Sequence, residues 1–328
     1  MREIAGPIAD DEEFIRRAEP FRRELRAHCY RMLGSMDDAE DAVQETYLRA
    51  WRAYREFEGR SSLRAWLYRI ATNACLTALQ RRARRLLPSG LGDPEADATV
   101  EAEARSKFEW LQPIPDALAS DESTNPAAIA AMRESVRLAL VASLQHLPPK
   151  QRAVLILRDV LNWPAADVAE VMRTTTAAVK SMLQRARARL EELAPTPERV
   201  VEPTESEARA LLDQYIAAFE NSDAAALERL LRDDATLELP PSAIWFAGRG
   251  ALAHARSGLG APGDWRMLPT AANGQPAAAA YHRREDGSYG AYAIVVLTTT
   301  RTHITRLVVF VDASLFDRFG LPRILPEG

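Results

Sequence analysis

The spacing of the apolar residues in this chain changes at a boundary marked by Pro195, Pro197 and Pro203. Before the boundary, apolar residues recur at helical spacing over long stretches, which indicates amphipathic helices. Beyond it, helical segments at 206–221 and 223–232 are followed by alternating runs at 276–284, 289–299 and 303–311, a pattern typical of antiparallel strands. A chain of 328 residues with two such patterns predicts several compact domains.

A proline-rich stretch divides the helical part. Residues 88–125 hold prolines with glycine and acidic residues between them, which is typical of a connector. We therefore predict one helical domain at 12–87, a linker at 88–125, a second helical domain at 126–194 and an α+β domain at 205–322. The linker also carries an apolar cluster: Phe108, Trp110, Leu111 and Ile114. Because a free linker has little use for a tryptophan, we expect this cluster to dock on a neighbouring domain.

Local signals predict several helix ends in the first domain. Gly34 is a natural stop for one helix, and Asp37 with Glu40 has the spacing of a capping box for the next. The predicted buried face of that next helix consists of Val43, Tyr47, Trp51 and Tyr54. The loop at 56–61 leads into serines suited to capping a further helix.

Positive charge is concentrated in two segments, although the chain has a formal net charge of -4. Residues 60–85 contain seven arginines and no acid, and residues 173–189 contain five basic residues and no acid. Acids gather instead at 10–13, 37–45 and 202–238. Phosphate contacts require local positive charge, whatever the net charge. Two basic helices without acids therefore favour nucleic-acid binding, although each one alone is also compatible with a solvated basic face.

Residues 164–190 have the pattern of a helix–turn–helix. A short helix after Pro164 precedes a turn at Arg173 and a second helix, whose apolar side holds the pair together while its polar side can enter a major groove. The side chains placed to approach bases are Thr175, Thr176, Lys180, Ser181 and Gln184. Those placed for phosphates are Arg185, Arg187 and Arg189.

Other features bear on compartment and cofactors. The chain has two cysteines, Cys29 and Cys75, and no CxxC or Cys/His cluster, which argues against a disulfide scaffold and a structural zinc site. Its first residues are acidic, unlike a signal peptide, and no apolar run approaches the ~20 residues that cross a bilayer. We expect a cytoplasmic protein with no cofactor, no bound metal and no membrane contact.

The segments together resemble a known family. Residues 28–33, 38–46 and 62–74 resemble region 2 of the extracytoplasmic-function (ECF) sigma factors, and residues 144–160 and 165–190 resemble their region 4. The resemblance spans about 14–86 and 128–193, and the order of the motifs is specific to the family. The sequence at 110–116, followed by a large C-terminal extension, resembles a subgroup fused to a SnoaL-like (NTF2-like) domain. The implied fold is two all-α domains followed by an α+β cone.

The resemblance implies an alternative sigma factor, not an enzyme, that binds core RNA polymerase and directs promoter-specific initiation. Its partners would be promoter DNA and the β′ clamp helices and β flap of the polymerase. Core polymerase would be bound by Asp41, Gln44, Glu45 and Leu48. The −10 region would be held by Arg60, Asn73, Arg81, Arg82, Arg84 and Arg85. The loop at 56–61 would capture an unstacked −10 base, and the helix at 175–189 would read the −35 element.

Four positions depart from the family pattern. Thr77 stands where many members have an acid, Ala177-Ala178 stand where Gly-Thr is common, and Met182 stands where arginine is frequent. These departures leave the promoter sequence open.

The C-terminal domain carries aromatic residues that could line the cavity of a cone, although plain core packing is the favoured interpretation for each of them. The candidate pocket, for a small-molecule ligand, consists of Tyr215, Phe219, Trp245, Trp265, Tyr292 and His303. Enzymes with this fold use Asp/His pairs as acid and base, but no spacing among Asp264, His282 and His303 singles out a pair. We expect this domain to regulate the sigma regions in cis by docking on them or on the linker.

Two other functions stay open. A stand-alone helix–turn–helix regulator would use 164–190 alone, would leave the first 86 residues unexplained, and predicts specific DNA binding without polymerase. An NTF2-like enzyme of the cyclase or isomerase type predicts turnover that depends on His303 or Asp264.

Overall fold

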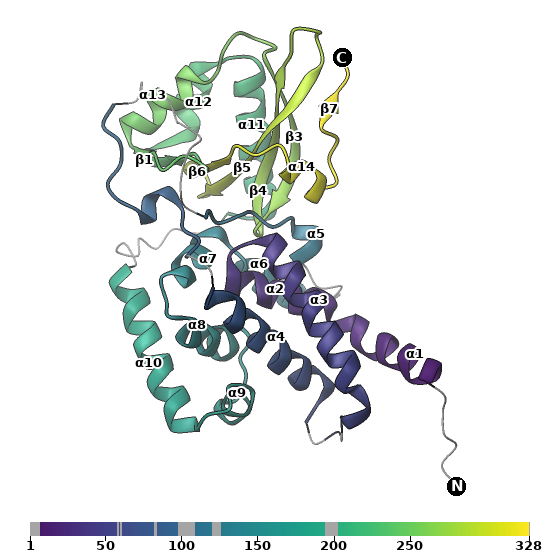
Figure 1. Ribbon diagram of the computed structural model, residues 1–328. Coiled ribbons are helices and arrows are strands. Elements are labelled where there is room, and N and C mark those ends of the chain that lie inside the picture. The colour runs from purple at the N-terminus through teal and green to yellow at the C-terminus, as the bar shows by residue number, and fades with distance from the viewer. Residues whose placement is uncertain are drawn as a thin grey trace. The chain divides into compact units, whose positions relative to one another are not determined.

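The computed structural model describes residues 7–57, 59, 61–81, 84–97, 109–119, 126–193 and 203–327. The chain forms two compact units, coloured along the sequence in Figure 1. The first unit comprises Met1–Arg85 and Ala117–Pro195, and the second comprises Leu86–Asp116 and Thr196–Gly328. The predicted linker is thus divided, because most of its described part belongs to the second unit.

The N-terminal part of the first unit is helical. Its elements are α1 (Pro7–Ala18), η1 (Glu19–Phe21), α2 (Arg22–Leu33), α3 (Met36–Ala53), η2 (Tyr54–Glu56) and α4 (Leu63–Leu79). Helices α2, α3 and α4 pack on one another. Helix α2 ends as predicted at Gly34, whose φ of 69° is in the left-handed region. Helix α4 is capped by Ser62, whose hydroxyl accepts from the Ala65 amide at 3.1 Å.

Two predictions about α3 are wrong. The cap is not the Asp37–Glu40 box, because the hydroxyl of Ser35 accepts from the Asp38 amide and the helix begins directly after it. Trp51 is not on the buried face: it is 45% exposed, and its indole N–H donates to Asp11 at 2.7 Å. The buried stripe of α3 instead ends at Ala50, one position earlier.

The C-terminal part of the first unit contains the predicted helix–turn–helix. Its elements are α5 (Asp116–Ala119), α6 (Pro126–Ser135), α7 (Leu138–Gln145), α8 (Pro149–Leu155), the π-helical η4 (Ile156–Val160), α9 (Ala165–Val171) and α10 (Thr176–Leu193). Pro164 precedes α9, and Val179, Leu183 and Ala186 form the buried side of α10. The helical pair therefore has the packing that its sequence predicts.

The second unit is an α+β domain. Its elements are η3 (Pro88–Gly90), α11 (Glu205–Glu220), α12 (Ala224–Leu230), β1 (Leu231–Glu238), β2 (Trp245–Ala247), α13 (Arg249–Ser257), β3 (Trp265–Ala272), β4 (Gln275–Arg283), β5 (Tyr289–Thr299), β6 (Ile304–Phe310), α14 (Leu315–Arg318) and β7 (Ile324–Leu325). The strand order is β2-β1-β6-β5-β4-β3, with β7 paired to β5. Strands β1 and β6 are parallel, and the other pairs are antiparallel.

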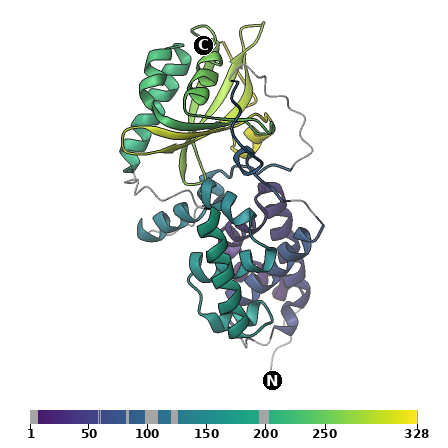
Figure 2. The same cartoon turned by 90° about the vertical axis from the view of Figure 1, so that its left-hand side faces the viewer.

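Helices α11, α12 and α13 lie on one face of this bent sheet, as Figures 1 and 2 show. The core between them includes Tyr215 of α11 and Val295 and Leu307 of the sheet. The predicted fold class, helical domains followed by an α+β domain with helices against a curved sheet, is confirmed. Among the helices of the described ranges, none is long and apolar enough to cross a membrane.

A buried histidine gives the first unit a predictable sensitivity to acid. His28 on α2 is fully buried, with Nε2 3.0 Å from the Thr72 hydroxyl. Burial, and then the nearby Arg31 charge, lowers the pKa of His28 to about 3. Between pH 6.5 and 3 the unfolded chain binds more protons at this site, so stability falls as pH falls.

We expect the free energy of unfolding to drop by about 2 kcal/mol from pH 7 to pH 5 through His28. Urea unfolding at both pH values measures this change, and His28→Gln should remove most of it. A His28→Gln protein that keeps the full pH dependence would assign the effect to other groups.

Candidate nucleic-acid interface

Helix α10 presents its predicted base-reading side to solvent. The Thr175 hydroxyl accepts from the Ala178 amide at 3.2 Å and so caps the helix. Exposed side chains follow this cap: Thr175, Thr176, Lys180, Ser181, Gln184, Arg185 and Arg187. Arg187 is tied to Asp159 by two hydrogen bonds of 2.8 Å. The other side of the helix is buried, so the exposed face has a fixed orientation.

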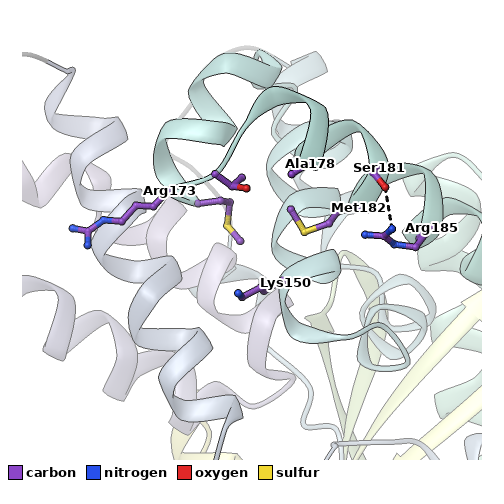
Figure 3. A pocket seen from close by; sticks show the side chains of 8 residues that line it. Lys150, Arg173, Ala178, Ser181, Met182 and Arg185 are labelled. Carbon is purple, nitrogen blue, oxygen red and sulfur yellow. Dashed lines mark hydrogen bonds between the residues drawn. The ribbon is translucent and has the colours of Figure 1, made fainter.

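A basic hollow of about 350 Å³ lies beside this face. Its lining is Lys150, Met172, Arg173, Thr174, Ala178, Ser181, Met182 and Arg185, shown in Figure 3. Arg185 donates to Ser181 at 2.9 Å. Lys150 was missed as a candidate from the sequence, because it lies on α8, far along the chain from the recognition helix. Three cationic side chains around one hollow form a surface suited to phosphates.

The predicted polymerase-binding residues lie on one stripe of α3. Asp41, Gln44 and Leu48 are exposed, and Glu45 is half-buried with an ion pair to Arg49 at 2.6 Å. Apolar side chains are also exposed on α3 and α1: Leu48, Trp51 and Ile15. An exposed apolar group rimmed by charge is typical of a protein–protein contact.

The predicted −10 residues have different surroundings. Asn73 is half-buried on α4, and Arg81 and Arg84 are exposed. Arg85 is largely buried and forms an ion pair with Asp38 at 2.9 Å. Arg60 and Arg82 lie outside the described residues.

A second hollow, of about 290 Å³, lies at the start of α4. The segment from Ser61 to Arg69 contributes Ser61, Ser62, Ala65, Trp66 and Arg69 to its lining. Helix α9 contributes Asp167, Glu170 and Val171. The ring of Phe57 lies 4.9 Å from that of Trp66, so the loop at 56–61 is flanked by aromatic packing.

In the second unit, the first part of the linker is bound to the edge of the sheet. The Ser89 amide donates to the buried Glu238 carboxylate at 2.9 Å, and Arg306 pairs with the same carboxylate. The Trp245 indole donates to the Gly92 carbonyl at 2.9 Å, and the Glu95 amide donates to the Trp245 carbonyl at 2.7 Å.

The last part of the linker is bound to the β3–β4 turn. Asn273, with a φ of 57°, and Gly274 form this turn, as an Asn-Gly pair commonly does. The Asn273 side chain accepts from the Ile114 amide at 3.1 Å, and the Asn273 amide donates to the Ile114 carbonyl at 2.9 Å. Leu111 and Ile114 are fully buried. The prediction that the apolar cluster docks on a neighbouring domain is confirmed for Ile114, while Phe108 lies outside the described residues.

The predicted ligand pocket separates into two groups. Tyr215, Phe219, Trp265 and Tyr292 form a continuous row, with ring-centroid distances of 4.9, 6.4 and 5.2 Å between successive members. Trp245 instead contacts the linker, and His303 contacts the Thr302 hydroxyl at 2.8 Å. A ligand in this domain stays a prediction.

Known proteins resemble both units. The Sigma-70 region 2 family matches residues 18–85, and the Sigma-70 region 4 family matches residues 137–190. The ECF RNA polymerase sigma factor SigG of Mycobacterium tuberculosis H37Rv is 50% identical over 329 residues, covering 98% of this chain and 88% of that protein. The RNA polymerase sigma-H factor of Pseudomonas aeruginosa is 32% identical over 157 residues, covering 48% of this chain and 73% of that protein.

A solved structure shares the fold of nearly the whole chain. The crystal structure of the Mycobacterium tuberculosis ECF sigma factor SigJ matches with a TM-score of 0.63 at 23% identity, covering 94% of this chain and 100% of that one. Given the helix–turn–helix, the two matched sigma regions and a 50% identical relative along almost the whole length, this chain belongs to the ECF sigma factors, the alternative sigma factors that direct transcription initiation by RNA polymerase.

Proposed function

We propose that the exposed face of α10 and the basic hollow beside it bind the −35 element. The observation that carries this assignment is that Lys150, Arg173 and Arg185 line one hollow beside a helix face that is exposed to solvent. The hollow would receive backbone phosphates, which position the helix, while Lys180 and Gln184 reach base edges. Arg187 is already paired with Asp159, so it would contribute less to phosphate binding than its position in the sequence suggests.

The stripe of α3 would bind core polymerase. Asp41, Gln44 and Glu45 offer hydrogen-bonding groups, and Leu48 offers an apolar anchor among them. An apolar centre with a polar rim is the usual organisation of a specific interface. The β′ clamp helices are the partner that the family resemblance implies, and the β flap would contact region 4.

The −10 element would be bound by α4, by the loop before it and by the segment after it. Asn73, Arg81 and Arg84 are accessible, whereas Arg85 is engaged with Asp38. We therefore assign Arg85 a structural part in this chain, with phosphate contacts left to Arg81 and Arg84.

The second unit would act on the sigma regions through the linker. It binds the linker at two separated places, near Ser89 and near Ile114. A small molecule in the aromatic row would alter activity if it bound one state of the linker better than the other. We assign this cytoplasmic protein no catalytic step. By function the chain would have four parts, namely region 2 at 12–87, the linker at 88–125, region 4 at 126–194 and the α+β domain at 205–322, although the linker is divided between the two compact units.

Promoter binding with and without core polymerase separates this function from its rivals. We expect the full chain to protect −10 and −35 DNA from nuclease only when core polymerase is present. Specific protection of duplex DNA by the chain alone, unchanged by polymerase, would favour a stand-alone regulator. Turnover of a small molecule that is lost in His303→Ala would favour an enzyme.

Lys150→Ala tests the hollow directly. Removing one phosphate contact should weaken −35 duplex binding similarly for all sequences and reduce the slope of log K against log salt by about 0.9. Fluorescence anisotropy of the holoenzyme over a salt series measures both quantities. Arg209→Ala, which removes an exposed arginine from α11, is the matched control and should change neither. An unchanged salt slope for Lys150→Ala would remove Lys150 from the interface.

A further inference from the structure

The chain passes from the second unit back to the first between Asp116 and Ala117, and hydrogen bonds hold it on both sides of this crossing. On the second-unit side, the Asp116 carboxylate accepts from the Gly274 amide at 2.7 Å. On the first-unit side, the Leu118 carbonyl accepts from the Arg26 guanidinium of α2 at 3.5 Å. Because these two bonds are only two residues apart in the chain, loosening the linker on the second unit also loosens Leu118.

Arg26 joins this crossing to the helix that we assign to core polymerase. Its Nε donates to the Glu40 carboxylate of α3 at 2.7 Å, while its Nη1 donates to the Leu118 carbonyl. The Arg26 side chain is 12% exposed and that of Glu40 28%, so water screens this ion pair only in part. One guanidinium thus bridges the end of the linker and the second turn of α3. The next residue of α3, Asp41, is the first of the predicted polymerase contacts.

The crossing at the other end of the linker, between Arg85 and Leu86, leads to the same end of α3. Arg85 donates through Nε and Nη2 to one carboxylate oxygen of Asp38, in the first turn of α3, at 3.2 and 2.9 Å. The adjacent Leu86 carbonyl accepts from the Leu111 amide, within the second unit, at 3.1 Å. Both crossings are therefore hydrogen-bonded to carboxylates among the first five residues of α3.

We propose that Arg26 is a positioning residue, through which a linker docked on the second unit holds the start of α3 in the arrangement that binds core polymerase. This inference rests on the polymerase-binding role proposed for α3. A surface already held in its bound arrangement loses less conformational entropy on binding, so a docked linker raises the affinity for polymerase and a loosened linker lowers it. A ligand of the second unit changes this affinity only if it binds the docked and the loosened states with different affinities.

Asn273→Gly loosens the linker at a position far along the chain from α3. Glycine accepts the left-handed backbone of this turn but lacks the side-chain oxygen that accepts from the Ile114 amide. Faster hydrogen exchange at the Ile114 amide verifies the loosening. We expect the affinity of the full chain for core polymerase, measured by fluorescence titration, to fall at least about fivefold. Ser222→Gly is the matched control, because it changes another polar residue of positive φ in the same unit to glycine, and it should leave this affinity unchanged.

The same substitution in an Arg26→Lys chain tests the route. Lysine keeps a positive charge for Glu40 but lacks the planar fork that also reaches Leu118. In this background Asn273→Gly should lower polymerase affinity by less than about twofold, because the coupling is already lost. Equal losses in the two backgrounds, or no loss in either, would overturn the role of Arg26.

Leu48→Glu separates this inference from the proposed function. If Leu48→Glu weakens polymerase binding while the losses from Asn273→Gly are equal in the two backgrounds, α3 binds polymerase and the coupling through Arg26 is wrong. If Leu48→Glu leaves polymerase binding unchanged, the assignment of α3 fails, and the positioning role of Arg26 fails with it.

Discussion

Arg152→Met is expected to lower the free energy of unfolding of the first unit by about 3 kcal/mol. Arg152 is buried, and its guanidinium donates to Gln145 Oε1 at 2.6 Å and to the carbonyls of Gln145 and Leu147 at 3.0 and 3.3 Å. It also donates to the Met32 carbonyl of region 2. Methionine fills a similar volume but leaves these acceptors without a donor inside the protein.

Two opposing effects set the size of that loss. Burial, and then the nearby Arg84 charge, lowers the pKa of Arg152 to about 10, so holding this cation inside the protein has a real cost. Removing the cation recovers that cost, but each unsatisfied buried acceptor loses about 1–3 kcal/mol. With several acceptors at helix ends the loss outweighs the recovery.

Thermal unfolding and hydrogen exchange measure the Arg152 effect. A loss of about 3 kcal/mol corresponds to roughly 6–12 °C in Tm for a unit of this size. Arg152→Lys keeps the charge but not the planar fork, and should fall between the wild type and Arg152→Met. Equal stability of Arg152→Met and the wild type would show that the guanidinium does not join the two regions.

Glu238→Ala is expected to destabilise the second unit by about 2–4 kcal/mol and to free the first part of the linker. Glu238 is fully buried on β1, and it accepts from Arg306 at 2.7 Å and from the Ser89 amide at 2.9 Å. Alanine removes both acceptors, leaving the Arg306 cation and the Ser89 amide without this partner. Because the Arg306 side chain is 22% exposed, water compensates part of the loss.

Hydrogen exchange at the Ser89 amide gives a local readout of the same change. Glu238→Ala should speed its exchange by about tenfold or more, since the amide then opens without breaking a charge-assisted bond. Glu238→Gln is the matched control, because it keeps an acceptor for Ser89 while removing the charge, and should lose about half as much stability. Slow exchange at Ser89 in Glu238→Ala would mean that the carboxylate does not hold the linker.

The helices of the first unit were predictable because their signals are local. Gly34 and Ser62 end and begin helices by backbone geometry and capping, which depend on a few neighbouring residues. The prediction for Trp51 failed because the burial of this residue depends on tertiary packing and not on local signals. Helical spacing identifies a face but not its border, and the packing of α3 against its neighbours decides which side of that border Trp51 lies on.

Strand β3 was missed because its pattern does not alternate cleanly and it contains Pro269. The Asn273-Gly274 pair was the available signal for the hairpin that joins it to β4, but the use of this turn as a linker contact could not be predicted. Contacts such as Ile114 with Asn273 or Ser89 with Glu238 join residues about 150 positions apart, and no local pattern encodes them.

In the candidate site too, some features could be predicted from the sequence and others depend on tertiary packing. The exposed face of α10 follows from its periodicity, whereas the contribution of Lys150 depends on how α8 packs beside α10. The ion pair of Arg85 with Asp38 likewise depends on tertiary structure. The sequence alone therefore could not show which of the arginines at 81–85 has a structural part and which are accessible to DNA.

Run-off transcription with purified core polymerase on genomic fragments tests the central claim most directly. The account predicts transcripts with defined start sites that appear only when the chain is added and that weaken in Lys180→Ala and Leu48→Glu. The absence of any transcript, together with specific duplex binding by the chain alone, would contradict the account and leave a DNA-binding regulator that acts without polymerase.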